Sequence, residues 1–330
     1  MALHKIGILG LGRVGGSLGL RLRERRLARE LWAWDPDPHV AEAARVARVA
    51  DRIARDPFTV VRGAQVVVAA LSPAIVRGEL HALAGDLSPG ALVTTTSAID
   101  AALPEEVEAV LPPAVAYVAG HPLFRRPALV EGYDATLFDD CVYCLLATPR
   151  THRDALEFMA GLVSALGAQP FFPDAAELAG WVALLETLPQ TLGLALHRTV
   201  IDALAELEIE RAAGAAFYTV TAPVAAEQDG PDAWLTGRAM LLPALDAYIA
   251  ELQRLRAAIA AGDTCLREET AALRRERRRL LARTAEQAEQ AALAPAAGVT
   301  PASVLGTMLG FPRLGRVPGK DTREKRRSES

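Results

Sequence analysis

Lysine and long apolar runs are scarce in this sequence. Among 330 residues the lysines are Lys5, Lys320 and Lys325, which excludes a hydroxyacid dehydrogenase that uses a lysine on a central helix. The chain also lacks a run of about 18 uncharged apolar residues, and a basic start followed by an apolar stretch. We therefore expect neither a membrane span nor a leader, and we predict a cytoplasmic protein.

Basic charge is not in excess either. Lysine and arginine total 36 against 40 acidic residues, which gives a net charge of −4. Without a positive field the chain is a poor match for phosphate backbones, so we predict no nucleic-acid partner. Hydrophobic residues make up 51% of the chain, enough for real cores, and the length indicates two domains.

Cysteine is limited to three residues, and two of them form the pair Cys141-x-x-Cys144. That spacing resembles half of a metal site. The surrounding residues are typical of a strand, however, where positions three apart point to opposite faces. We therefore predict no metal site.

A glycine pattern near the N-terminus is the most informative feature present. An apolar strand leads into Gly10, Gly12 and Gly15, and Asp35 follows Gly15 by 20 residues. Gly10 permits a tight turn, Gly12 lets the backbone approach a diphosphate, and Gly15 allows close packing of the next helix. Asp35 ends a second strand, where its carboxylate accepts ribose hydroxyls and repels a 2′-phosphate. The pattern predicts a dinucleotide site that prefers NAD to NADP.

Other residues border the same predicted site. The helix that begins near Arg13 and Val14 aims its amides at the diphosphate. The Arg13 side chain either touches the diphosphate or is solvated, and the sequence does not choose between these. Ser72 and Pro73 follow another strand, and we expect them to contact the cofactor through their backbone.

Strand and helix patterns alternate along the first half of the chain. We predict strands at 30–35, 65–71, 91–95, 114–119, 141–147 and 169–172. We predict helices at 38–49, 74–84, 104–109 and 151–166, the last ending at Gly167. This alternation is typical of a doubly wound α/β fold of the Rossmann type. We assign residues 1–172 to an NAD-binding domain.

Strand signals vanish beyond residue 172. Long patterns rich in alanine and leucine predict helices near 174–209, 211–225, 231–261 and 263–293. The third of them carries an apolar stripe for burial against other helices. We assign 173–293 to an all-helical substrate and dimerisation domain, and 294–330 to a tail whose end we expect to be disordered.

Candidate catalytic groups must follow strand ends, because ligands of open α/β sheets lie beyond the carboxyl ends of the strands. Of the six histidines, His121 meets this condition, since it follows the strand at 114–119 and precedes Pro122. Ser97, after the strand at 91–95, is a second candidate. The alternatives are a histidine that merely ends its strand and a serine that caps the next helix.

These motifs together resemble the prephenate and arogenate dehydrogenase family. The similarity spans about residues 4–285 and includes the glycine pattern, Ser97 and the sequence Gly120-His121-Pro122-Leu123. The resemblance implies NAD-dependent oxidative decarboxylation of a cyclohexadienyl substrate toward tyrosine, by a homodimer joined through its helical domains. It also implies that His121 is the base that draws off the hydroxyl proton, and that Ser97 orients the hydroxyl or the cofactor carboxamide.

The substrate side departs from the family pattern. Thr94 and Ile99 stand where the family usually has aspartate and lysine. Two usual histidines are replaced by Thr187 and Gln190, which become candidate substrate contacts. Loop residues Arg125 and Arg126 are candidate carboxylate ligands, and the alternative is that both side chains are solvated.

Three functions stay open at this point. The first is an active prephenate or arogenate dehydrogenase. The second is a dehydrogenase of another small hydroxy or cyclohexadienyl substrate, because losing charged partners costs binding energy. The third is a catalytically weak NAD-binding protein that acts as a sensor.

Overall fold

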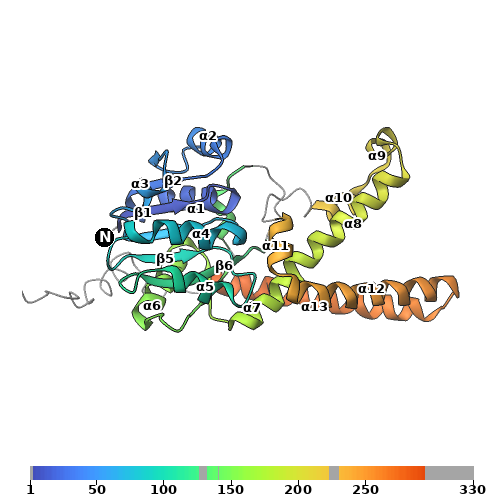
Figure 1. Cartoon of the computed structure of the whole chain (residues 1–330). Coiled ribbons are helices and arrows are strands. Elements are labelled where there is room, and N and C mark those ends of the chain that lie inside the picture. The colour runs from blue at the N-terminus through green and yellow to red at the C-terminus, as the bar shows by residue number, and fades with distance from the viewer. Residues whose placement is uncertain (1–2, 126–131, 140, 223–229, 294–330) are drawn as a thin grey trace, which may run out of the picture.

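The computed structural model describes residues 3–125, 132–139, 141–222 and 230–293. Figure 1 shows a layered α/β part, which contains the N-terminus, and a set of long helices that project from it. The predicted tail from residue 294 onward lies outside the described residues.

The core of the α/β part is an eight-stranded sheet in the order β3-β2-β1-β4-β5-β6-β7-β8. Its strands are β1 (Leu3–Leu9), β2 (Ala28–Trp34), β3 (Arg52–Ile53), β4 (Val66–Ala69), β5 (Leu92–Thr95), β6 (Ala116–Leu123), β7 (Val142–Leu146) and β8 (Gln169–Phe171). All neighbouring pairs are parallel except β6 and β7. The predicted fold class, a Rossmann-type doubly wound sheet followed by helices, is confirmed.

Helices cover both faces of this sheet. They are α1 (Arg13–Glu24), α2 (Pro38–Val46), α3 (Pro57–Val61), α4 (Pro73–Leu83), α5 (Leu103–Val110) and α6 (Arg153–Leu166). Strand β4 is buried along its whole length, and its side chains alternate between the two faces. Val66 and Val68 pack with α1 and α6, whereas Val67 and Ala69 pack with α3, α4 and α5. Burial on both faces explains why this strand is uniformly apolar.

Two short elements escape sequence prediction. β3 (Arg52–Ile53) has two residues, and α3 (Pro57–Val61) has five, too few for a periodic signal. Local signals do mark α3, because Asp56 accepts a hydrogen bond from the Thr59 amide and Pro57 occupies the first turn.

The strand that carries His121 is longer than predicted. β6 continues from Ala116 to Leu123 instead of ending at residue 119, because β7 pairs with it in the antiparallel direction beyond the end of β5. His121 lies opposite Cys144 in this pairing. The histidine therefore lies within a strand, and the prediction that it follows the end of its strand is wrong.

The described residues after β8 form helices alone. They are α7 (Ala175–Val182), the π-helical turn η3 (Ala183–Thr187), α8 (Leu188–Ala203), α9 (Glu206–Ala212), α10 (Ala215–Thr221), α11 (Gly230–Thr236), α12 (Arg238–Ala260) and α13 (Cys265–Leu293). The prediction of one helix over 174–209 is wrong. The π-helical turn η3 widens the helix just before Pro189, which has no backbone N–H to donate. Helix α8 ends before Leu204, whose backbone is extended.

Helices α12 and α13 form a long hairpin that projects from the body of the molecule (Figure 1). Gly262 makes the turn with a positive φ of 65°. An ion pair between Arg254 and Glu269 links the two helices at 2.5 Å. Within the described residues, none of these helices combines the length and apolar character that crossing a membrane demands.

Candidate functional site

The glycine-rich turn between β1 and α1 has the geometry that its sequence predicts. Gly10 has a φ of +90°, and a Cβ atom there would collide with the Ala70 carbonyl. A Cβ atom on Gly15 would collide with the Gly10 carbonyl. A Cβ on Gly12 would meet no protein atom within 4 Å, so protein packing does not require a glycine at this position.

The N-terminus of α1 begins at Arg13, directly after Gly12, and no side chain caps it. Its first amides therefore face the space in front of the helix, where an anion is favoured. Arg13 and Val14 are half-buried, and Arg13 lies near the carboxylate of Asp134. These features fit the diphosphate of a dinucleotide.

Asp35 follows β2 and faces the same turn. Its Oδ2 atom accepts a hydrogen bond from the Leu11 amide at 2.6 Å, and its Oδ1 atom accepts one from the Asp37 amide at 2.8 Å. The carboxylate is thus fixed beside the glycine-rich turn. That position suits a contact with a ribose hydroxyl.

Ser72 and Pro73 lie at the start of α4, next to the carboxyl end of β4. Ser72 precedes the helix without a side-chain capping bond, and Pro73 is the first residue of the helix and is buried. Both are therefore at the strand edge where the sequence places the cofactor.

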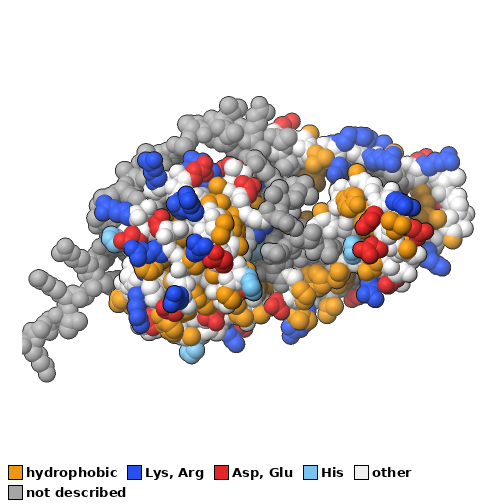
Figure 2. Space-filling view, turned by 90° about the horizontal axis from the view of Figure 1, so that it is seen from above, with side chains coloured by type: hydrophobic (Ala, Val, Ile, Leu, Met, Phe, Trp, Pro, Cys, Tyr) orange, Lys and Arg blue, Asp and Glu red, His pale blue; other side chains and the backbone are white. Residues whose placement is uncertain are grey.

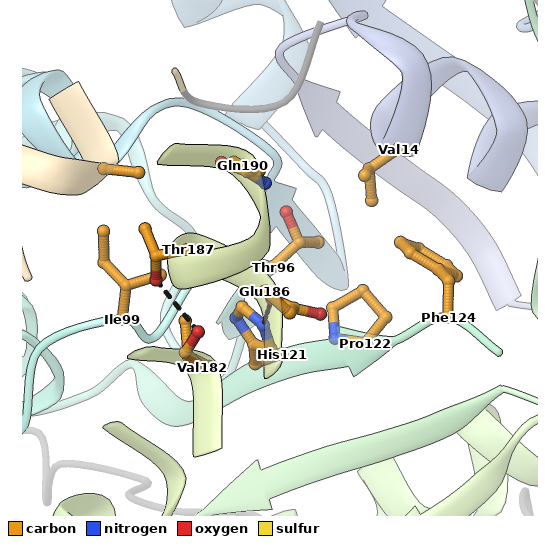
Figure 3. A pocket seen from close by; sticks show the side chains of 11 residues that line it. Val14, Thr96, Ile99, His121, Pro122, Phe124, Val182, Glu186, Thr187 and Gln190 are labelled. Carbon is orange, nitrogen blue, oxygen red and sulfur yellow. Dashed lines mark hydrogen bonds and ion pairs between the residues drawn. The ribbon is translucent and has the colours of Figure 1, made fainter. Parts of the chain in front are cut away.

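A cleft of about 500 Å³, including space open to solvent, lies between this edge of the sheet and the helices η3 and α8. Its lining residues are Val14, Thr96, Ile99, His121, Pro122, Phe124, Val182, Glu186, Thr187, Gln190 and Ala233. Figure 3 shows that His121 and Pro122 come from β6, whereas Glu186, Thr187 and Gln190 come from the helical part. The cleft therefore joins the first turn of α1, through Val14, to His121.

His121 is buried and has a partner on each ring nitrogen. The Ala98 amide donates to Nδ1 at 3.2 Å, and Nε2 lies 2.9 Å from Oε2 of Glu186. An amide that donates to Nδ1 requires a lone pair there, so the ring proton sits on Nε2 and is donated to the carboxylate. This assignment of the proton follows from the hydrogen-bond partners.

Ser97 lies two residues beyond the end of β5 and is buried, with 4% of its surface exposed. Thr96, its neighbour, lines the cleft, whereas Ser97 is not among the lining residues. The amide of the next residue, Ala98, holds the His121 ring. The segment after β5 therefore acts on His121 through its backbone.

The predicted substrate residues divide into two groups. Thr187 and Gln190 line the cleft as predicted. Thr187 donates its hydroxyl to the Val182 carbonyl at 2.9 Å, and Gln190 accepts from the indole of Trp234 at 3.2 Å. Arg125 is exposed and is not a lining residue. Arg126 lies outside the described residues.

Glu186 is a candidate functional residue that the sequence analysis did not name. It lies in the motif that departs from the family, and it is the one charged group in the described lining of the cleft. A signal was present, because Glu186 interrupts an apolar helical run three residues before Pro189. Glu186 also lies in the π-helical turn η3, and π-helical turns occur frequently at functional sites.

The two cysteines of the Cys-x-x-Cys pair are buried and carry free thiols. Burial raises the pKa of Cys144 to about 12 and raises the pKa of Cys141 further. Among the described residues, histidines, cysteines and acids do not gather into a cluster suited to a metal ion. The thiols are therefore packing groups of the sheet.

Comparison with known proteins shows which proteins this chain is similar to. A family model for the nucleotide-binding domain of prephenate dehydrogenase matches residues 18–171. The resemblance to the prephenate and arogenate dehydrogenase family is confirmed. The cyclohexadienyl dehydrogenase of Zymomonas mobilis is 26% identical over 267 residues, which cover 78% of this chain and 89% of that protein.

Two solved structures share the fold over most of their length. The prephenate dehydrogenase of A. aeolicus, in complex with hydroxyphenyl propionate and NAD+, has a TM-score of 0.71 at 19% identity, covering 85% of this chain and 99% of that one. The Synechocystis arogenate dehydrogenase has a TM-score of 0.60 at 22% identity, covering 87% and 99%. The predicted dehydrogenase class is confirmed at the level of the family.

Proposed function

We propose that this protein is an NAD-dependent dehydrogenase that oxidatively decarboxylates a cyclohexadienyl substrate of the prephenate or arogenate class. The observation that carries the proposal is the shared cleft: Val14, at the dinucleotide turn, and the buried His121 line the same space. Hydride transfer from a hydroxyl-bearing carbon needs a cofactor beside a proton acceptor, and His121 with its partner Glu186 forms the acid–base pair of this space. The family membership of the fold supports this chemistry.

The cofactor half of the proposed site is formed by the glycine-rich turn and its neighbours. Gly10, Gly12 and Gly15 shape the turn, and the first amides of α1, with Arg13 and Val14, would hold the diphosphate. Asp35 would accept the ribose hydroxyls, and Ser72 and Pro73 would border the cofactor. NAD supplies the hydride acceptor when bound, and the A. aeolicus relative has NAD+ in its structure.

The substrate half combines apolar walls with a few polar groups. Ile99, Phe124 and Val182 give the cleft sides that suit a six-membered carbon ring. Thr187 and Gln190 are the proposed substrate contacts. In this arrangement Ser97 supports the loop that holds His121.

The charge of the cleft favours a second candidate within the same class. No arginine or lysine is among its described lining residues, and Glu186 is negative. Prephenate carries two carboxylates, and a missing charged partner typically costs a few kcal/mol of binding. This observation favours a cyclohexadienyl or other small hydroxy substrate with fewer negative charges.

We further propose a homodimer joined through residues 173–293. Many large apolar side chains of the helical part are exposed in the single chain, and Figure 2 shows hydrophobic patches among the charged side chains of this part. On α12 and α13 these residues include Leu242, Ile249, Leu252, Ile259, Leu273, Leu280 and Leu281. Apolar patches of this extent are typical of protein interfaces.

The proposed reaction is tested by following NADH absorbance with prephenate, arogenate and a panel of small hydroxy acids. We expect turnover with at least one cyclohexadienyl substrate, and faster turnover with NAD+ than with NADP+. NAD+ binding without turnover of any substrate would contradict the enzymatic proposal and leave the sensor function.

A further inference from the structure

Glu186 and His121 meet across the boundary between the sheet and the helical part. Residue 121 belongs to β6 and residue 186 to η3, and they are 65 positions apart in the chain. Figure 3 shows the two side chains next to each other in the cleft. Their contact is the one ionisable pair in the described lining of this space.

The hydrogen bonds of His121 leave it without a nitrogen that can accept a proton. Nδ1 is occupied by the Ala98 amide, and Nε2 carries the ring proton and donates it to Glu186. An imidazole in this form is a hydrogen-bond donor toward the cleft. The group in contact with it that can take up a proton is the Glu186 carboxylate.

The position of Glu186 is built into the helix. The π-helical turn Ala183–Thr187 is stabilised by the hydrogen bond from Thr187 to the Val182 carbonyl. Pro189 follows and has no backbone N–H, so it cannot donate the hydrogen bond that a regular helix would form at this position. This wide turn directs residue 186 into the cleft.

Exposure also separates the roles of the two side chains. The His121 side chain is 8% exposed, whereas that of Glu186 is 31% exposed. The carboxylate therefore has one oxygen on the buried imidazole and a remaining surface open to the cleft and to water. A proton on Glu186 can be exchanged with water in the cleft. His121 stays in one orientation because both of its ring nitrogens have hydrogen-bond partners.

We propose that Glu186 accepts the proton of the reacting hydroxyl group, and that His121 holds the carboxylate through Nε2–H. This inference rests on the proposed function. The substrate O–H bond breaks and its proton moves to a Glu186 oxygen. The adjacent C–H bond gives up a hydride, with both electrons, to oxidised NAD, and a carbonyl forms. As CO₂ leaves, its C–C electron pair stays in the ring, and the new phenolic oxygen takes the proton back from Glu186.

The first test replaces Glu186 by glutamine, which keeps an oxygen for Nε2–H but cannot act as a base. Glu186→Gln should lower kcat by about 100-fold or more, with KM and the Kd for NAD+ within about threefold. Glu177→Gln is the matched control, because Glu177 is exposed on the preceding helix α7 and loses the same charge. Glu186→Ala is measured in parallel in case the glutamine variant does not fold.

The outcomes separate the two levels of the proposal. Wild-type protein without turnover overturns both the proposed function and the proton-accepting role of Glu186. Active wild-type protein with a kcat of Glu186→Gln or Glu186→Ala within about threefold of its own value overturns the role of Glu186 alone. These two results are distinguished by the wild-type assay, before any variant is compared.

The second test needs no turnover. Nitrogen-15 NMR of the histidine rings in the full chain should show His121 protonated on Nε2, with the signal assigned by its loss in His121→Asn. The same tautomer should persist in Glu186→Gln, since the amide oxygen still accepts the proton. A ring protonated on Nδ1 would overturn the inference, because Nε2 would then be the free acceptor.

Discussion

The Asp35 carboxylate is bound to the Leu11 amide, with 2.6 Å between Oδ2 and the nitrogen. This hydrogen bond ties the end of β2 to the glycine-rich turn after β1. The residue proposed to select the ribose and the turn proposed to hold the diphosphate are therefore one rigid unit. Ligand contacts made by such a unit need little ordering on binding.

Replacing Asp35 by asparagine should weaken the preference for NAD+ over NADP+. Asparagine keeps an oxygen for the Leu11 amide but removes the charge that repels a 2′-phosphate. We expect the ratio of the two affinities to fall by about tenfold, which is about 1.4 kcal/mol. Titration with both cofactors measures it. Asp37→Asn, two residues away, is the control, and an unchanged ratio in Asp35→Asn would place selection elsewhere.

Two glycines should respond differently to alanine. Gly15→Ala places a methyl group against the Gly10 carbonyl, and overpacking of this kind costs about 1–3 kcal/mol of folding free energy. Gly12→Ala meets no protein atom within 4 Å and should leave Tm unchanged. We nevertheless expect Gly12→Ala to bind NAD+ at least about tenfold more weakly, because its methyl group occupies the approach to the diphosphate. Thermal unfolding and cofactor titration test the pair, and normal NAD+ affinity in Gly12→Ala would contradict the placement.

The dinucleotide half of the site was predictable because its signals are local. Gly10, Gly12 and Gly15 act within one turn, and Asp35 directly follows the adjacent strand. The substrate half depends on contacts between distant segments. His121 is held in a strand by β7, and Glu186 reaches it through a π-helical turn that periodicity alone does not reveal. Nonlocal pairing of this kind leaves no fixed spacing in the sequence.

Thiol reactivity should divide the three cysteines. Thiolate is the reactive form, and burial raises the pKa of Cys144 to about 12 and that of Cys141 as well, so both stay protonated as pH rises to 9. Cys265 is exposed, although nearby Asp263 also raises its pKa. We expect one thiol per chain to react with a thiol reagent at pH 8, and none in Cys265→Ser. Rapid labelling of Cys265→Ser in the folded state would show that the sheet is open at this edge.

Charge placed on α12 should separate the proposed dimer. Ile249 and Leu252 are each 48% exposed in the single chain. Changing both to glutamate buries two charges per subunit at the proposed interface, which is strongly unfavourable. Sedimentation should show a dimer for the wild type and a monomer for this variant. Gln253→Glu on the same helix is the control. A wild-type monomer at all concentrations would refute the dimer.

The most direct test of the central claim is the initial rate of NADH formation by wild-type protein and His121→Asn, measured with the same cyclohexadienyl substrate at saturating NAD+. Asparagine keeps a polar group of smaller size but cannot hold both the Ala98 amide and Glu186 as the imidazole does. We predict clear turnover by the wild type and a kcat lower by about 100-fold or more in the variant, with the Kd for NAD+ unchanged. Equal kcat in the two proteins would contradict the placement of the chemistry at His121.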